Sequence, residues 1–251
     1  MKLYGVPNSQ PVRAVAWACL MKGRPFDFVM TSQNKAAKQP EYLQAINPRG
    51  TIPAIDDDGI VLWESHAILI YLAEKFGWQD LWPEDLHARA RVNQYLHFHH
   101  RNTRELVIGW SRTLWPNLLG VDDPDEAWFR RNTFPGLENN AKVVDNALGI
   151  INAMLGADPY LAGAAPTLAD ISAYEELGQN QARYANCTDF SPYPNIARWL
   201  EDMAKLPHHD EAHEIWSLLG DLNRISGGMA RIAGANKQAA RTLQAAADAL
   251  R

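Results

Sequence analysis

The period of the apolar positions changes several times along the N-terminal part of the chain. Residues 2–6 (KLYGV) form a short apolar stretch, and the turn-forming cluster PNSQP follows at residues 7–11, so we expect a strand and then a loop. Beyond the loop, apolar residues recur at helical spacing: Val12, Val15, Ala16, Cys19 and Leu20. Proline in the first turn and Gly23 past the last apolar residue are typical helix boundaries. The pattern predicts a helix that begins beside Ser9.

A second strand and a hairpin are predicted after this helix. Residues 26–31 alternate between apolar and polar positions as a strand does, and residues 39–45 give a weaker helical signal. Two apolar stretches at residues 52–55 and 60–63 flank the turn DDDG, which is the strongest hairpin signal in the sequence. These residues therefore favour a sheet of at least three segments after the first strand.

One more amphipathic helix completes the N-terminal pattern. It is predicted over residues 65–76, and Gly77 provides its stop. A βαβ unit, a short helix and then a hairpin with a helix is the thioredoxin-like arrangement. We therefore expect an α/β thioredoxin-like domain (βαβ-α-ββα) over residues 1–77.

Helix boundaries replace hairpin signals in the rest of the chain. Residues 78–86 are interpreted as a linker, and residues 87–221 are expected to form an all-α domain. The signals are a long segment at 85–115, a segment opened by DDPD at 122–125, the capping-box variant TLAD at 167–170 before a helix over 171–183, and a helix over 195–206. Residues 222–251 are a helical extension, alanine-rich from residue 237, that either packs over the site or frays.

Composition narrows the class of protein. The chain has 251 residues, 47% hydrophobic and 21% charged, which is enough for two modest cores. A formal charge of −5 without a basic stripe argues against nucleic-acid binding. Without a visible leader or a run of about 18 apolar residues, we expect no membrane span and a cytoplasmic location. Cys19 and Cys187 are expected to be buried thiols rather than a disulfide.

Ser9 is the first candidate for chemistry because it precedes the first helix. A helix N-terminus offers unpaired amide donors and the positive end of a dipole, which stabilise an anion such as a thiolate. An ordinary N-cap serine explains the same residue at least as well. No cysteine lies in this loop, so any thiol chemistry here needs a thiol that arrives with a ligand.

Pro53 is the second candidate because it opens the third predicted strand. It is either an edge-strand proline or a cis-proline. A cis-proline at this point would present the backbone of Ile52 to a ligand. The residues leave the two readings about equal.

Glu64 and Ser65 form the third candidate, at the start of the helix after the hairpin. Their side chains can simply cap the helix. Equally, Ser65 and the free amides can hold a carboxylate while Glu64 pairs with an ammonium group.

Histidines suggest a metal site only at first sight. His209 and His213 share a helix face, and His97, His99 and His100 are close in sequence. Neither set has a carboxylate or cysteine at the spacing a third ligand needs. We therefore predict no metal and expect surface or interdomain histidines.

Several motifs together resemble the cytosolic glutathione transferases, and within them the theta class, plant members included. The matching segments are SQPVRAV at 9–15, NPRGTIPAI at 47–55, ESHAILIYL at 64–72, HHRNTR at 99–104, TLAD at 167–170 and DEAHEI at 210–215. They span roughly residues 1 to 220. The resemblance implies a transferase with glutathione as co-substrate and no metal, acting in detoxification on small electrophiles.

The resemblance also implies roles for individual residues. The serine hydroxyl that stabilises the glutathione thiolate corresponds to Ser9, and the arginine on the electrophile side corresponds to Arg104. The residues expected to bind glutathione are Gln10, Lys38, Thr51, Ile52, Pro53, Glu64 and Ser65. The resemblance further implies a homodimer and a glutathione peroxidase side activity.

The glycyl end of the expected glutathione site departs from the family pattern. Ala37 stands where several theta enzymes have a histidine, with Lys38 beside it as a substitute, and Thr51 replaces a common lysine. Arg101 stands where some relatives have an acid. A non-catalytic binding or scaffold protein on the same fold is therefore the main alternative, and a glutathione-dependent reductase or lyase is the second.

Overall fold

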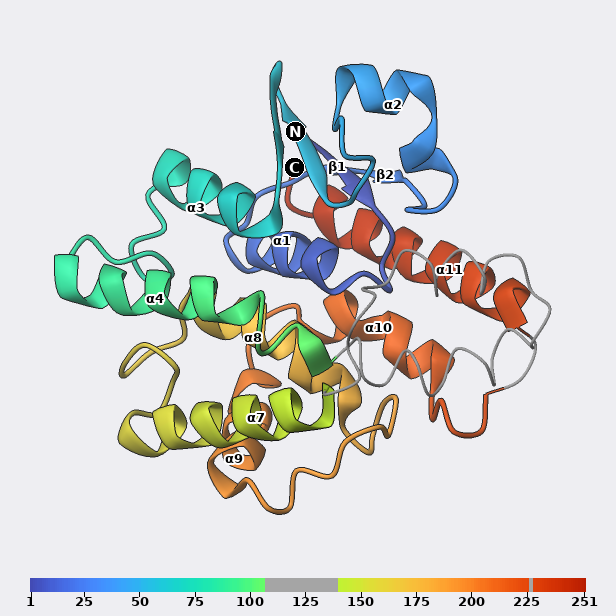
Figure 1. Cartoon of the computed structure of the whole chain (residues 1–251). Helices are drawn as coiled ribbons and strands as arrows, with labels where there is room; N and C mark the ends of the chain where they lie inside the picture. The colour runs from blue at the N-terminus through green and yellow to red at the C-terminus, as the bar shows by residue number, and fades with distance from the viewer. Residues whose placement is uncertain (107–139, 226–227) are drawn as a thin grey trace.

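A four-stranded sheet with its helices is packed on a larger group of helices (Figure 1). The computed structural model describes residues 1–106, 140–225 and 228–251, with side chains from residue 144 onwards in the second range. The end of the long segment predicted at 85–115 and the segment predicted to open at 122–125 lie outside the described residues.

The sheet has the predicted mixture of parallel and antiparallel strands. Its order is β2-β1-β3-β4, with β1 parallel to β2 and antiparallel to β3, and β3 antiparallel to β4. The strands are β1 (Lys2–Gly5), β2 (Asp27–Met30), β3 (Ala54–Asp57) and β4 (Ile60–Trp63). The DDDG turn closes the hairpin because Asp58 and Gly59 both adopt positive φ, as tight hairpin turns require.

Four helical segments accompany the sheet. They are α1 (Gln10–Met21), the 3₁₀ helix η1 (Ala36–Lys38), α2 (Pro40–Ala45) and α3 (Ser65–Phe76). Proline lies in the first turn of α1 and begins α2, and Gly77 ends α3 in the left-handed conformation. The predicted thioredoxin-like arrangement is confirmed.

The described part of the C-terminal half is helical. Its segments are α4 (Leu86–His99), α7 (Asn140–Ala157), α8 (Leu168–Leu177), η2 (Gly178–Asn180), α9 (Pro194–Met203), α10 (His209–Leu219) and α11 (Gly228–Asp248). The capping box at α8 is present. The Thr167 amide donates to the Asp170 carboxylate, and the Ala169 amide donates to the Thr167 hydroxyl. Among the described helices, none is both long enough and apolar enough to cross a bilayer.

Two predicted helices are longer than the observed ones. Helix α4 ends at His99, where the chain enters a series of turns. Helix α8 ends at Leu177 and tightens into η2, because the side-chain amide of Asn180 donates to the carbonyl oxygen of Glu176 (2.7 Å). This bond satisfies a carbonyl that would otherwise lack a partner at the helix end. Apolar residues continue at helical spacing past both ends, so the prediction made α4 and α8 too long.

Helix α1 lies between the sheet and the helical half, and it is buried on all sides (Figure 1). The largest apolar cluster runs through both halves: Trp17 and Leu20 of α1, Ile68 and Leu72 of α3, Tyr95 of α4, Ile171 and Tyr174 of α8, and Trp199 of α9 belong to it. The continuity of this core fixes α1, and therefore its first residues, relative to the helices around it.

Helix α11 packs on the N-terminal half instead of fraying. Gln244 pairs with the edge strand β2: its Oε1 accepts from the Phe28 amide (2.7 Å) and its Nε2 donates to the Phe26 carbonyl (3.2 Å). A glutamine side chain thus occupies the place of a neighbouring strand on an otherwise open edge. Figure 1 shows α11 running alongside α10 towards β1 and β2. The extension is therefore a docked element of the fold.

Candidate functional site

Three loops meet at one edge of the sheet. Tyr4 pairs with Ala54, and Ala54 pairs with Trp63. The end of β1, the beginning of β3 and the end of β4 are therefore in one row. The loops attached at this row carry Ser9, Ile52 with Pro53, and Glu64 with Ser65. Antiparallel pairing thus brings three sequence-predicted segments to the same edge.

Ser9 occupies the N-cap position of α1 with an extended backbone (φ −83°, ψ 119°). Its amide donates to the Val6 carbonyl (3.0 Å), and its carbonyl accepts from the Arg13 amide (3.0 Å). The half-buried side chain makes no capping hydrogen bond to the first turn of α1. The hydroxyl therefore stands beside the free amides and the positive dipole end of α1 without being used to cap them.

Gln10 and Arg104 are brought together by the contact between the two halves. The Nη1 of Arg104 donates to the Oε1 of Glu176 (2.5 Å) and to the Oε1 of Gln10 (3.3 Å). The buried amide of Gln10 also donates from Nε2 to the Oε1 of Gln179 on the helix pair α8–η2 (3.1 Å). Gln10 therefore links α1 to the helical half, while the partly exposed Arg104 reaches the residue next to Ser9.

Two consecutive acids on α8 hold the arginines of this region. The fully buried Arg13 donates from Nε to the Oε2 of Glu175 (2.6 Å), and His213 contacts the Oε1 of Glu175 (3.0 Å). Burial raises the pKa of Glu175, but the charges of His213 and Arg13 outweigh it, and the pKa lies below the usual value. The pKa of Glu176 is also lowered, because Arg104 and His99 outweigh its burial. Both acids are therefore carboxylates.

The sequence reasoning missed these acids, although a signal was present. Glu175 and Glu176 lie in a helix, LADISAYEEL, that begins with a capping box and is buried along its whole length. A buried carboxylate needs a cationic partner, so the pair could have been matched with arginines elsewhere in the chain. Their partners, Arg13 and Arg104, lie far away in sequence.

The Ile52–Pro53 peptide bond is cis, which decides between the two readings of Pro53. Strand β3 follows it directly and is an inner strand of the sheet. The Ile52 side chain is 8% exposed and packs in a small apolar cluster with Val12 and Tyr42. Because its side chain is packed inside, Ile52 can contact a ligand at the sheet edge only through its backbone groups.

Thr51 and Lys38 are both held by hydrogen bonds to the loop around Gly50. The Thr51 hydroxyl accepts from Asn47 (2.9 Å), and its carbonyl accepts from Tyr42 (2.8 Å). Lys38 donates to the carbonyl of Gly50 (2.6 Å). The Lys38 ammonium is thus bonded to the residue before Thr51, while Ala37 is fully buried.

Glu64 and Ser65 begin α3 in an open position. Glu64 is exposed, has a positive φ of 72° and makes no side-chain capping bond. Ser65 is half-buried as the first residue of the helix. The simple capping role considered for Glu64 is therefore not observed.

Three of the histidines pack together where α3 meets the end of α4, while His97 is exposed. The ring of His66 packs against those of His99 (4.9 Å between centroids) and His100 (4.7 Å). Burial, followed by the charges of its neighbours, lowers the pKa of His66 well below its usual value. Within the residues that the structure describes, no three His, Cys, Asp or Glu side chains are grouped to hold a metal ion.

Neither cysteine is a nucleophile at neutral pH. Burial raises the pKa of the Cys19 thiol to about 12, and burial likewise raises that of Cys187 to about 12. A thiolate is the reactive form of sulfur. Sulfur chemistry at the sheet edge therefore depends on an external thiol.

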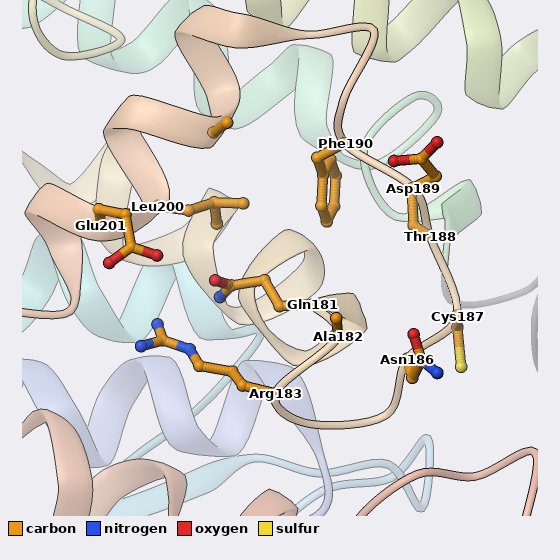
Figure 2. A pocket seen from close by; sticks show the side chains of 11 residues that line it. Gln181, Ala182, Arg183, Asn186, Cys187, Thr188, Asp189, Phe190, Leu200 and Glu201 are labelled. Carbon is orange, nitrogen blue, oxygen red and sulfur yellow. The ribbon is translucent and has the colours of Figure 1, made fainter.

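A hollow of about 720 Å³ lies elsewhere, around the loop after η2 and helix α9. Figure 2 shows Phe190 and Leu200 on two sides of it, with Arg183 and Glu201 at its border. None of the predicted site residues lines this hollow. It is therefore a surface feature separate from the edge that carries Ser9.

Comparison with known proteins assigns the family. Residues 3–80 match the family described as glutathione S-transferase, N-terminal domain, and residues 134–207 match glutathione S-transferase, C-terminal domain. The chain belongs to the glutathione S-transferase family. The prediction from the sequence that this chain is an enzyme of the glutathione transferase family is confirmed.

The relatives place this transferase in the theta class. It is 39% identical to human glutathione S-transferase theta-2B over 82% of this chain and 83% of that protein. It is 34% identical to glutathione S-transferase T1 of Arabidopsis thaliana over 86% and 88%. With T2 of the same plant it shares 33% identity, but it spans only 36% of that protein's length.

Solved structures show the same fold. The structure of a Bombyx mori glutathione transferase covers 98% of this chain, and the chain covers 96% of it, with a TM-score of 0.70 and 28% identity. The thioredoxin-like and helical halves of this transferase thus have the architecture of its family.

Proposed function

We propose that the chain catalyses the attack of the glutathione thiolate on small electrophiles, with the Ser9 hydroxyl donating a hydrogen bond to the sulfur. The position of Ser9 carries this proposal, because its hydroxyl is not used to cap α1 and stands at the helix N-terminus. The raised pKa values of both cysteines support an external thiol. Each unit by which the site lowers the thiol pKa corresponds to about 1.4 kcal/mol.

Glutathione would lie along the sheet edge. The Ile52 backbone next to Pro53 would bind its cysteinyl part, and Glu64 and Ser65 would bind the ammonium and carboxylate of its γ-glutamyl end. Lys38 and Thr51 would hold the glycyl carboxylate. In this arrangement the domain of residues 1–77 would bind glutathione, and the domain of residues 87–221 would bind the electrophile.

The chain's own part in the reaction is binding, orientation and charge stabilisation. With an alkyl halide, the thiolate forms a sulfur–carbon bond while the halide leaves with the bonding electrons. Arg104, 3.3 Å from Gln10, would stabilise the sulfur or the departing anion. With an organic hydroperoxide, attack of the thiolate on the terminal oxygen would break the O–O bond, form glutathione sulfenic acid and release the alcohol. A second glutathione would then react with the sulfenic acid to form the disulfide and water.

Replacing Ser9 with alanine tests the proposal. A hydrogen bond to a charged group contributes about 1.5–3 kcal/mol, so Ser9→Ala should lower turnover with a haloalkane roughly 10- to 100-fold. Glutathione affinity, measured by calorimetry, should change little. As a matched change, Ser65→Ala should weaken affinity instead. Unchanged turnover of Ser9→Ala at neutral pH would remove Ser9 from the mechanism.

The altered glycyl end favours a second candidate, a non-catalytic binding or scaffold protein. Ala37 is buried and Arg101 is exposed, so neither supplies the contact found in some relatives. Glutathione at millimolar concentration should raise the melting temperature of an enzyme by mass action. A turnover assay with one haloalkane, one hydroperoxide and one disulfide separates the enzyme from the scaffold and from a reductase or lyase.

The remaining properties proposed for this transferase follow its family. They are a homodimer, a cytoplasmic location and a part in detoxification. Light scattering of the purified protein tests the homodimer. The chain has a mass of 28.1 kDa, and a dimer should have twice that mass.

A further inference from the structure

Helix α11 reaches back to the loop that carries Ser9. The backbone amide of Asn8 donates to the Oδ1 of Asn236, 228 residues further along the chain, at 2.9 Å. Asn236 is 6% exposed, and its Nδ2 donates to the Ile232 carbonyl one turn earlier (3.0 Å). These two bonds fix the amide orientation, because a carbonyl needs the donor end and an N–H needs the acceptor end.

The contact holds one particular peptide group. The Pro7–Asn8 peptide has its carbonyl bonded to the Nη1 of Arg13 (2.9 Å) and its N–H bonded to Asn236. Both ends of the peptide plane are therefore fixed by side chains, from α1 on one side and from α11 on the other. The next residue in the chain is Ser9.

Helix α11 is itself held firmly beyond this contact. Gln244 pairs with Phe26 and Phe28 of the β2 region, and Arg251 bonds to Asp27. Ala239 and Ile232 pack with α10 in a second apolar cluster. A helix docked at these points presents Asn236 in a defined place, which a positioning contact requires.

We infer that Asn236 is a positioning residue for Ser9: it orients the Pro7–Asn8 peptide and so aims the serine hydroxyl at the glutathione sulfur. This inference rests on the proposed role of Ser9. A hydrogen bond weakens steeply when its angle or distance changes, so a loop that is no longer fixed would stabilise the thiolate less. The effect would fall on the ionisation of bound glutathione and on turnover rather than on its binding.

The test compares two α11 amides that both bond to backbone of the N-terminal half. Asn236→Ala removes the contact with the Ser9 loop, and Gln244→Ala removes the contact with β2. In the first variant we expect the pH profile of kcat/KM for the electrophile, measured at saturating glutathione, to move up by about one unit. This is about a tenfold loss below the apparent pKa, while KM for glutathione changes little. The second variant should lose melting temperature but keep the pH profile. Asn236→Leu repeats the test with a side chain that cannot accept the hydrogen bond but does not lower helix propensity.

A double-mutant cycle separates this inference from the function on which it rests. If Asn236 acts through Ser9, adding Asn236→Ala to Ser9→Ala should cause no further loss of turnover. Should Ser9→Ala have no effect, the proposed function fails, and the inference with it. If Ser9→Ala lowers turnover but Asn236→Ala leaves the pH profile in place, or shifts it no more than Gln244→Ala does, only the inference is overturned.

Discussion

Helices α1 and α3 begin at the same sheet edge, but their first residues are held in different ways. The loop before α1 is fixed by side chains from the rest of the molecule, Arg13 with its partner Glu175 and Asn236 of α11. The start of α3 is open: Glu64 is exposed and Ser65 is half-buried. The proposed sulfur end of the site is thus set by long-range contacts, and the γ-glutamyl end by local chain geometry.

This difference matches what each end would have to do. A hydrogen bond that lowers a thiol pKa needs a fixed donor, because its strength depends on geometry. An exposed carboxylate and serine that bind a zwitterion tolerate more freedom, since exposed charge pairs contribute modestly. Changes at α1 should therefore affect stability and turnover, whereas changes at α3 should affect affinity.

The largest expected effect comes from breaking the buried pair under α1. Arg13→Met removes the guanidinium that pairs with Glu175 and leaves a buried carboxylate without it. Removing one partner of a buried ion pair costs about 3–5 kcal/mol of unfolding free energy. Urea denaturation measures it. Arg13→Met combined with Glu175→Leu should recover much of the loss, and Lys22→Met, which removes an exposed pair with Asp80, should have a much smaller effect. A loss for Arg13→Met no greater than that of the control would contradict the prediction.

A smaller effect should appear as the pH falls. Burial, together with neighbouring His213, lowers the pKa of His209 from 6.5 to about 4. Between these values the unfolded chain binds a proton that the native state does not, so stability is full above pH 6.5 and decreases as the pH falls towards 4. A shift from 6.5 to about 4 corresponds to a contribution of about 3 kcal/mol. His209→Gln should flatten the unfolding free energy over this range, and an unchanged slope would show that other groups cause it.

The smallest effect is expected at the start of α3. Glu64→Gln and Ser65→Ala should each weaken glutathione binding by roughly tenfold, about 1.4 kcal/mol, as measured by calorimetry. Because both residues are at the surface, the unfolding free energy should stay within about 0.5 kcal/mol of the parent. The comparison of the two helix starts would break down if Ser9→Ala weakened affinity more than these changes.

Much of the fold was predictable because its signals are local. Proline and glycine mark the ends of α1 and α3, and the DDDG turn with its flanking apolar residues specifies the hairpin. The capping box at Thr167 was read correctly as the beginning of α8. Helix ends were predicted less well: α4 and α8 stop where side-chain and turn contacts intervene, and apolar periodicity does not report those contacts.

The sequence by itself determined that Ser9 precedes a helix, that the loop around it has no cysteine, and which family motifs the chain carries. Only the tertiary structure decided that Glu175 pairs with Arg13, that Gln10 faces Arg104, and that Asn236 reaches Asn8. The reason is physical. Periodicity and capping depend on neighbours within a turn or two, whereas the partner of a buried polar side chain depends on how distant helices pack.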